Sequence, residues 1–223
     1  IVTAADASEQ ERYAADELRY YLERMTSAAF SVGSEPRPEG MLAVGRGAAA
    51  LLGVEDSELG DDGFVVRTVG GSLAGGKRGV IYGVYELLER LGCRFFTATC
   101  EKIPTSPRLL LPDIDTRQVP ALEYRDHNYY ECTQYPRFAV KLRLNGNCVP
   151  IREKHGDSIR YAWFAHTFDL LVPPEKYAET HPEYYSLIDG KRKTQRSCTQ
   201  LCLTNPEVLE ISIESVRAAL KAN

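Results

Sequence analysis

Features that define several common protein classes are missing from this sequence of 223 residues. No apolar run approaches the ~18 residues that a membrane-spanning helix needs. The 27 basic residues are outnumbered by 31 acidic ones, giving a net charge of −4. The chain therefore lacks the basic surface that nucleic acids and anionic membranes attract. These absences predict a soluble protein that binds neither nucleic acid nor a membrane.

Motifs for metals and for common catalytic devices are also missing. The six cysteines form no Cys-x-x-Cys pair, and the closest two, Cys198 and Cys202, have no histidine nearby to complete a zinc set. The sequence contains no His-x-x-x-His pair and no Gly-x-Ser-x-Gly nucleophile elbow. We therefore predict no metal, no cofactor and mostly free, buried thiols. Cysteine usage leaves the redox compartment open.

The most informative stretch that is present covers residues 75–96, GGKRGVIYGVYELLERLGCRFF. Its apolar residues recur at three- and four-residue steps, which predicts an amphipathic helix ending near Gly92, followed by a strand at residues 93–96. The glycines at its start have two interpretations, a phosphate cradle or a tight strand-to-helix connection. Their spacing matches neither the Rossmann nor the P-loop motif, and this favours the tight connection.

The residues before this stretch predict a small sheet with helices packed on it. Residues 8–25 should form a helix capped by Ser8, with Glu11 completing a capping box. Short apolar runs predict strands at residues 30–32 and 41–44, with a short helix at 45–52. A hairpin is expected at residues 63–74 around Gly70-Gly71. We interpret residues 1–115 as one α/β domain.

The residues that follow alternate strand, polar loop and helix twice. Strands are predicted at residues 121–125 and 161–166, and a helix at 138–144. A third strand, at 184–187, should enter a tight turn at Asp189-Gly190, and a last helix should be capped by Thr204. This order is typical of a (β/α)₈ barrel, which needs on the order of 250 residues. We interpret residues 116–223 as the first part of such a barrel, and the chain as a fragment of a longer protein.

Two groups of motifs carry a family resemblance. The run GGKRGVIYGVYELLERLGCRFF resembles the signature helix of the accessory N-terminal domain in α-glucuronidases and β-N-acetylhexosaminidases. The runs PALEYRD, AHTFDLLVPPEKYAETHPEYYSLIDGKR and QLCLTNPEV are similar to a large bacterial family of uncharacterised barrel proteins of glycoside-hydrolase type. The resemblance implies carbohydrate chemistry. In related barrel glycosidases the catalytic carboxylates follow later strands, which would lie beyond Asn223.

Barrel active sites form at the carboxyl ends of the strands, and a set of polar and aromatic side chains is expected there. Such side chains can hydrogen-bond hydroxyl groups or stack on a sugar ring. Arg125 could bind the carboxylate of a uronic acid in a bidentate pair. The candidate substrate-binding residues are Arg125, Asp126, His127, His166, Tyr185, Gln200 and Asn205.

Each candidate also has a purely structural interpretation. Arg125 and Asp126 could form an ion pair at a strand end, and His166 could be a satisfied, partly buried histidine. The two amides of the set could bond to loop backbone, and at most one of the adjacent Tyr184 and Tyr185 can face a ligand if they lie in a strand. His155 is expected in an exposed polar loop.

Glycoside hydrolysis needs two carboxyl groups, ~5–5.5 Å apart for retention and ~6.5–9.5 Å for inversion. The acids nearest to the predicted strand ends are Asp126, Glu131 and Asp169, and the sequence does not show that any two face each other.

Our leading hypothesis is therefore the N-terminal portion of a glycoside hydrolase that acts on an oligosaccharide or glycoside. The alternative is a non-catalytic carbohydrate-binding or interaction module, and a weaker alternative is a structural domain. An open barrel edge would expose unpaired backbone, so we expect the chain either to form a homodimer or to be a remnant of a larger protein.

Overall fold

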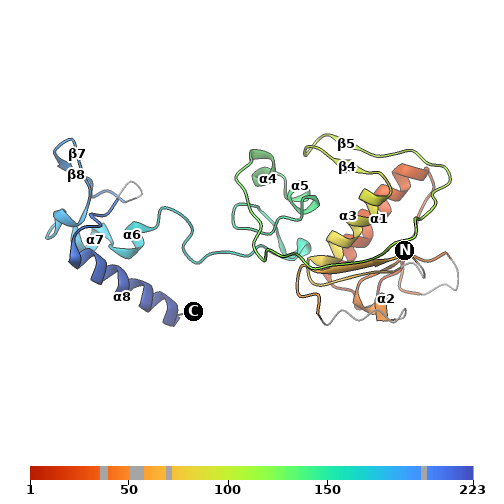
Figure 1. Cartoon of the computed structure of the whole chain (residues 1–223), viewed down its shortest axis with the longest axis horizontal. Coiled ribbons are helices and arrows are strands. Elements are labelled where there is room, and N and C mark those ends of the chain that lie inside the picture. The colour runs from red at the N-terminus through yellow and green to blue at the C-terminus, as the bar shows by residue number, and fades with distance from the viewer. Residues whose placement is uncertain (36–39, 51–57, 69–71, 197–199, 223) are drawn as a thin grey trace. The chain divides into compact units, whose positions relative to one another are not determined.

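The computed structural model describes residues 1–35, 40–50, 58–68, 72–196 and 200–222 (Figure 1). The chain forms two compact units, a first unit of Ile1–Arg160 and a second unit of Tyr161–Asn223. Both contain helices and short strands, so the mixed α/β class predicted from the sequence is correct. None of the described helices is both long enough and apolar enough to cross a bilayer.

A four-stranded mixed sheet forms the base of the first unit, in the order β1-β3-β2-β6. Strands β1 (Ala43–Val44) and β3 (Ser72–Gly75) are parallel, whereas β2 (Phe64–Arg67) runs antiparallel to β3 and to β6 (Asp115–Gln118). The antiparallel β2–β3 pair is the predicted hairpin, and its Gly70-Gly71 connection lies outside the described residues. No strand forms at residues 30–32, where an isolated bridge joins Gly33 to Val2.

Two long helices cover this sheet, α1 (Glu9–Thr26) and α3 (Gly79–Arg90), and Figure 1 shows them side by side. The predicted capping box is present on α1, because Glu11 N donates to Ser8 Oγ and Ser8 N donates to Glu11 Oε2. The apolar stripes of both helices are buried, except that Tyr13 of α1 is partly buried, and the helical periodicity predicted this arrangement. The stripes meet through Leu18, Tyr21, Leu22, Ile81, Val84, Tyr85 and Leu88.

The glycine cluster before α3 is a tight strand-to-helix connection. A Cβ on Gly76 or on Gly79 would overlap the carbonyl oxygen of Gly60 or of Gly63, respectively. The backbone N–H groups of Arg78 and Gly79 donate to the Asp61 carbonyl at 2.7 and 2.8 Å. These first N–H groups of the helix are already bonded within the protein, so the structure favours the tight connection over the phosphate cradle.

The rest of the first unit consists of short elements. They are α2 (Arg46–Ala50), β4 (Arg94–Phe95), β5 (Glu101–Lys102), α4 (Tyr130–Gln134), α5 (Pro136–Lys141) and the 3₁₀ turn η1 (Glu153–His155). The predicted helix at 138–144 is thus α5, which starts two residues earlier and ends three earlier.

The strand predicted at residues 121–125 is wrong. This segment follows Pro120 and joins no sheet. Its carbonyl groups instead accept hydrogen bonds from side chains, Leu122 O from Arg125 and Glu123 O from Asn145. Segments up to Arg160 belong to the first compact unit, whereas the sequence places a domain boundary at 115/116. That boundary stays a prediction, since a family domain need not coincide with a compact unit.

The second unit is built mainly from turns and one long helix. Its elements are α6 (Phe168–Leu171), α7 (Pro174–Tyr177), the 3₁₀ turn η2 (Pro182–Tyr184), β7 (Leu187–Ile188), β8 (Lys191–Arg192) and α8 (Pro206–Ala222). Strands β7 and β8 pair antiparallel across the predicted turn, where Asp189 and Gly190 have φ of 50° and 72°. The buried core comprises Val172, Tyr184, Tyr185, Leu201 and Val208.

Three local predictions for this unit need correction. Residues 161–166 form no strand, because Ala165 and His166 adopt left-handed φ of 52° and 45°. Tyr184 ends η2 rather than starting a strand, and the strand begins only at Leu187. The cap of α8 is Asn205, not Thr204, since Asn205 Oδ1 accepts from Glu207 N at 2.9 Å. The described residues of the chain form no closed barrel.

Candidate functional site

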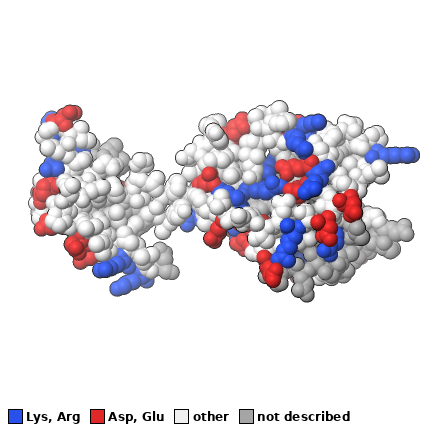
Figure 2. All heavy atoms as spheres, viewed as in Figure 1, with Lys and Arg blue, Asp and Glu red and all other residues white. Residues whose placement is uncertain are grey.

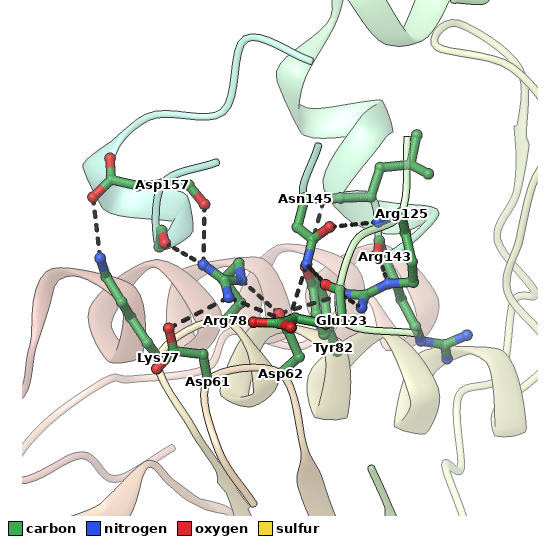
Figure 3. A network of polar contacts seen from close by, with 12 residues as sticks. Asp61, Asp62, Lys77, Arg78, Tyr82, Glu123, Arg125, Arg143, Asn145 and Asp157 are labelled. Carbon is green, nitrogen blue, oxygen red and sulfur yellow. Dashed lines mark hydrogen bonds and ion pairs between the residues drawn. The ribbon is translucent and has the colours of Figure 1, made fainter. Parts of the chain in front are cut away.

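A buried polar network in the first unit is centred on the carboxylate of Asp62 (Figure 3). Arg78 contacts it with two nitrogens, Nε to Oδ1 at 2.5 Å and Nη2 to Oδ2 at 3.2 Å. Asn145 Nδ2 donates to Oδ2 at 3.0 Å. Arg78 Nη1 also donates to the Gly156 carbonyl at 3.1 Å. The start of α3 and residues 145–156 are thereby joined, so the basic side chain of the GGKRG motif has a structural role.

The same network contains Arg125, a predicted substrate-binding residue. Its Nε donates to Arg143 O and its Nη1 to Leu122 O, both at 2.7 Å, and its Nη2 lies 3.4 Å from Asp62 Oδ1. The guanidinium also lies over the Tyr82 ring, 5.7 Å from its centre. Protein groups therefore engage most of its donors. The structural interpretation is favoured, although the ion-pair partner is Asp62 rather than Asp126.

Asp126 and His127 follow Arg125 and also have partners inside the protein. Asp126 Oδ2 accepts from Tyr124 Oη at 2.7 Å and from Cys148 N at 2.8 Å, and Oδ1 accepts from His127 N at 2.9 Å. Burial acts to raise the pKa of Asp126, but these hydrogen bonds outweigh it and lower the pKa. His127 Nδ1 accepts from Tyr129 N at 3.1 Å. Asp126 is thus an ionised acceptor that orders its own loop.

The other four predicted residues lie in the second unit, where two are structural and two are exposed. Tyr185 is fully buried and donates to Val172 O at 3.2 Å, and Asn205 caps α8. His166 has an exposed side chain, as does Gln200, whose backbone carbonyl accepts from Ser186 N at 2.8 Å. Of the four predicted residues in this unit, only His166 and Gln200 therefore have side chains that remain available to a ligand.

A surface pocket that the sequence did not predict lies between α1, α5 and η1 of the first unit. Its volume is about 630 Å³, and its lining includes Tyr13, Tyr20, Arg137, Arg152 and Lys154. Figure 2 shows basic and acidic side chains interspersed on the visible face of this unit. The pocket brings together segments far apart in the sequence, and the one local signal was the run Arg152-Glu-Lys-His, interpreted as a polar loop.

Tyrosine rings hold the cations of this pocket in place. The guanidinium of Arg137 lies 4.6 Å from the centre of the Tyr20 ring, and its Nε is 2.9 Å from Glu17 Oε1. Lys154 Nζ lies 5.6 Å from the centre of the Tyr13 ring. Within the described part of the chain, neither Lys154 nor Arg152 forms an ion pair with a carboxylate. Two positive charges therefore remain to attract an anionic group.

His155 forms the floor of this pocket, which corrects the expectation that it is exposed. Its side chain is buried, 2% exposed, and its ring packs edge-on against Tyr13. Burial, together with the positive charges of Lys154 and Arg152, lowers the pKa of His155 to about 4. The ring is therefore neutral at pH 7.

The acids that were expected near the strand ends have structural partners. Glu131 Oε2 accepts from Ala98 N at 3.1 Å, and Asp169 Oδ2 lies 3.3 Å from Arg196 Nε. With Asp126 held by its own loop, none of the three is left as a free carboxylate.

Comparison with models of protein families places the chain in a family. A family model described as "Domain of unknown function (DUF4838)" matches residues 95–223. No curated protein matches the chain. Because the matched segment covers more than half of the sequence, the chain belongs to the DUF4838 family.

Proposed function

We propose that the chain is the N-terminal portion of a glycoside hydrolase, and that this portion binds carbohydrate but does not carry the catalytic carboxylate pair. The resemblance of its motifs to accessory and barrel domains of such enzymes supports the proposal. The sheet of the first unit, covered by α1 and α3, agrees with the accessory domain that this resemblance implies. Under the same proposal, residues 116–223 are the beginning of a (β/α)₈-type barrel.

The observation that carries the binding role is the pocket between α1, α5 and η1. Its volume of about 630 Å³ falls within the range of ~300–1,000 Å³ that is usual for small-molecule sites. Guanidinium and ammonium groups can donate several hydrogen bonds to sugar hydroxyls, and Arg152 can pair with a sugar carboxylate. The pocket suits an oligosaccharide, and an acidic one best.

The ionisation of the carboxyl groups supports a non-catalytic role. A glycosidase acid must be protonated near neutral pH, which requires a raised pKa. In Glu101, burial acts to raise the pKa, but hydrogen bonds from Lys141 and Tyr21 lower it overall. The pKa of Glu183 is also lowered, first by a backbone hydrogen bond and then by His181. These groups and Asp126 are all poorly suited to donate a proton.

The binding role can be tested by titrating the 223-residue chain with paired oligosaccharides that differ in one uronic acid, followed by NMR shifts. We expect both sugars to bind and the acidic one to bind more tightly. Arg152→Ala should weaken binding of the acidic sugar by ~10-fold, because it removes a charge-assisted hydrogen bond. Arg117→Ala is the matched control, since Arg117 lies on β6 and pairs with Glu58. Absence of binding, or equal losses of affinity in both variants, would refute the proposal that this pocket binds carbohydrate.

A different assay distinguishes the glycoside hydrolase from the alternative, a binding module that belongs to no hydrolase. The longer natural gene product, if it hydrolyses aryl glycosides or glucuronides, supports the enzyme. A longer product that binds the same sugars but never hydrolyses them supports the module instead.

A further inference from the structure

Three potential metal ligands converge in the second unit, independently of the pocket described above. They are His181, which precedes η2, Glu183 within η2, and Glu207 in the first turn of α8. His181 Nδ1 lies 3.0 Å from Glu183 Oε1, and one ligand atom from each residue lies within 4.8 Å of the other two.

Surrounding contacts orient two of these side chains. The imidazole of His181 stacks almost parallel on the buried Tyr184 ring, with centres 4.6 Å apart and planes 7° apart. The Tyr184 hydroxyl donates to Glu207 Oε2 at 2.7 Å. The backbone N–H of Glu207 is in turn fixed by the Asn205 cap. A tyrosine thus supports both the imidazole and one carboxylate, as outer partners of metal ligands commonly do.

The charge and type of these ligands suit a divalent cation. One imidazole and two carboxylates carry a total charge of about −2 when histidine is neutral, and nitrogen and oxygen donors of this kind bind Zn²⁺. A shallow pocket next to Glu207 has a volume of about 390 Å³ and is also lined by Glu210 and Glu214. These two further carboxylates add to the negative potential, and the open side leaves space for a metal-bound water. The positive charge of Arg192 also acts on Glu183 and offsets part of this potential.

We propose that His181, Glu183 and Glu207 bind a divalent metal ion of the Zn²⁺ class, which joins η2 to the start of α8. The small core of the second unit gives this ion a structural purpose. The buried hydrophobic cluster of its described part has five residues, and small units with little core are often stabilised by a metal. The sequence alone does not reveal these three ligands, because His-x-Glu is not a metal motif by itself and Glu207 lies in a distant segment.

The test uses the 223-residue chain after treatment with EDTA. Zn²⁺ is added, and binding is followed by calorimetry and by the unfolding temperature. We expect one site and a higher unfolding temperature with Zn²⁺. His181→Ala should weaken binding by at least ~100-fold, since it removes the nitrogen ligand. His166→Ala is the matched control, because it removes an exposed histidine of the same unit.

Glu183→Gln provides a second variant. It keeps the size of the side chain and leaves the buried core undisturbed, because Glu183 is exposed. It should also weaken binding, whereas a site formed by cysteine thiolates would not respond. If the wild-type chain does not bind Zn²⁺, the proposal is wrong. Equal affinities of Glu183→Gln and wild type, or equal losses in His181→Ala and His166→Ala, would overturn it as well.

Discussion

The two compact units of this chain are stabilised in different ways. The first unit buries the apolar stripes of α1 and α3 against its sheet and adds buried ion pairs, such as Asp62 with Arg78. The second unit has a buried hydrophobic cluster of five described residues, and its described ion pairs lie at the surface, where Arg196 is 60% exposed. A buried charge depends on its partner, whereas exposed pairs contribute little. Removing one partner of a buried ion pair should therefore lower stability more than removing one partner of an exposed pair.

The largest expected effect comes from removing the charge of Asp62. We expect Asp62→Asn to lower the free energy of unfolding by ~3–5 kcal/mol, because the buried charge of Arg78 would keep only the longer ion pair to the exposed Asp61, at 3.4 Å. Urea unfolding followed by circular dichroism measures this. Asp16→Asn is the matched control: it breaks the exposed Asp16–Arg19 pair and should change stability by less than ~1 kcal/mol. Similar losses in the two variants would contradict the contrast between buried and exposed pairs.

Elements whose signals are local could be predicted from the sequence. Helices α1, α3 and α8 combine a regular periodicity with a start signal or a stop signal, and all three form close to the expected residues. Strands predicted from short apolar or aromatic runs at 121–125 and 161–166 do not form. In 121–125, backbone carbonyl groups accept hydrogen bonds from side chains, and 161–166 contains two residues with left-handed φ. Neither cause is visible in an apolar pattern.

Sites assembled from distant segments were the least predictable. Arg125 was chosen because it ends a predicted strand, yet its partner Asp62 belongs to the loop before β2. The pocket lined by Tyr13 and Arg152, and the cluster of His181 and Glu207, each join residues that no spacing rule connects. Tertiary packing brings the residues of each site together, and the local sequence pattern does not encode that packing.

A smaller effect is expected from acid, through the buried His155 in the first unit. Its pKa is about 4 in the folded chain, and the reference value for an unfolded chain is about 6.5. Between these values the unfolded state binds a proton that the folded state does not, so stability falls as pH decreases from 6.5 to 4. At about 1.36 kcal/mol per pKa unit, the loss is about 3 kcal/mol.

Urea unfolding of the wild type and of His155→Gln between pH 7.5 and 4.5 isolates this contribution. The variant should lose less stability than the wild type over this range, whatever its stability at pH 7.5. His166→Gln is the control for the loss of one histidine from an exposed position. Parallel pH profiles of the wild type and His155→Gln would show that the buried imidazole does not cause the slope.

The smallest effect, and the most direct comparison of the units, comes from removing one helix cap in each. Ser8→Ala and Asn205→Ala should each cost ~1 kcal/mol, because each leaves one backbone N–H of a helix start without its acceptor. The consequences should differ in extent. Helix α1 buries a full stripe, whereas Val208 is the buried residue of α8.

Loss of the α8 cap should therefore appear as local opening, with ~5-fold faster hydrogen exchange along its first two turns. Loss of the Ser8 cap should speed exchange in the middle of α1 only as much as in the rest of the first unit's core, because these buried amides exchange through global unfolding of the unit. If exchange along α8 did not change in Asn205→Ala, α8 would be held by more than its cap and Val208, and the two units would be more alike than their cores indicate.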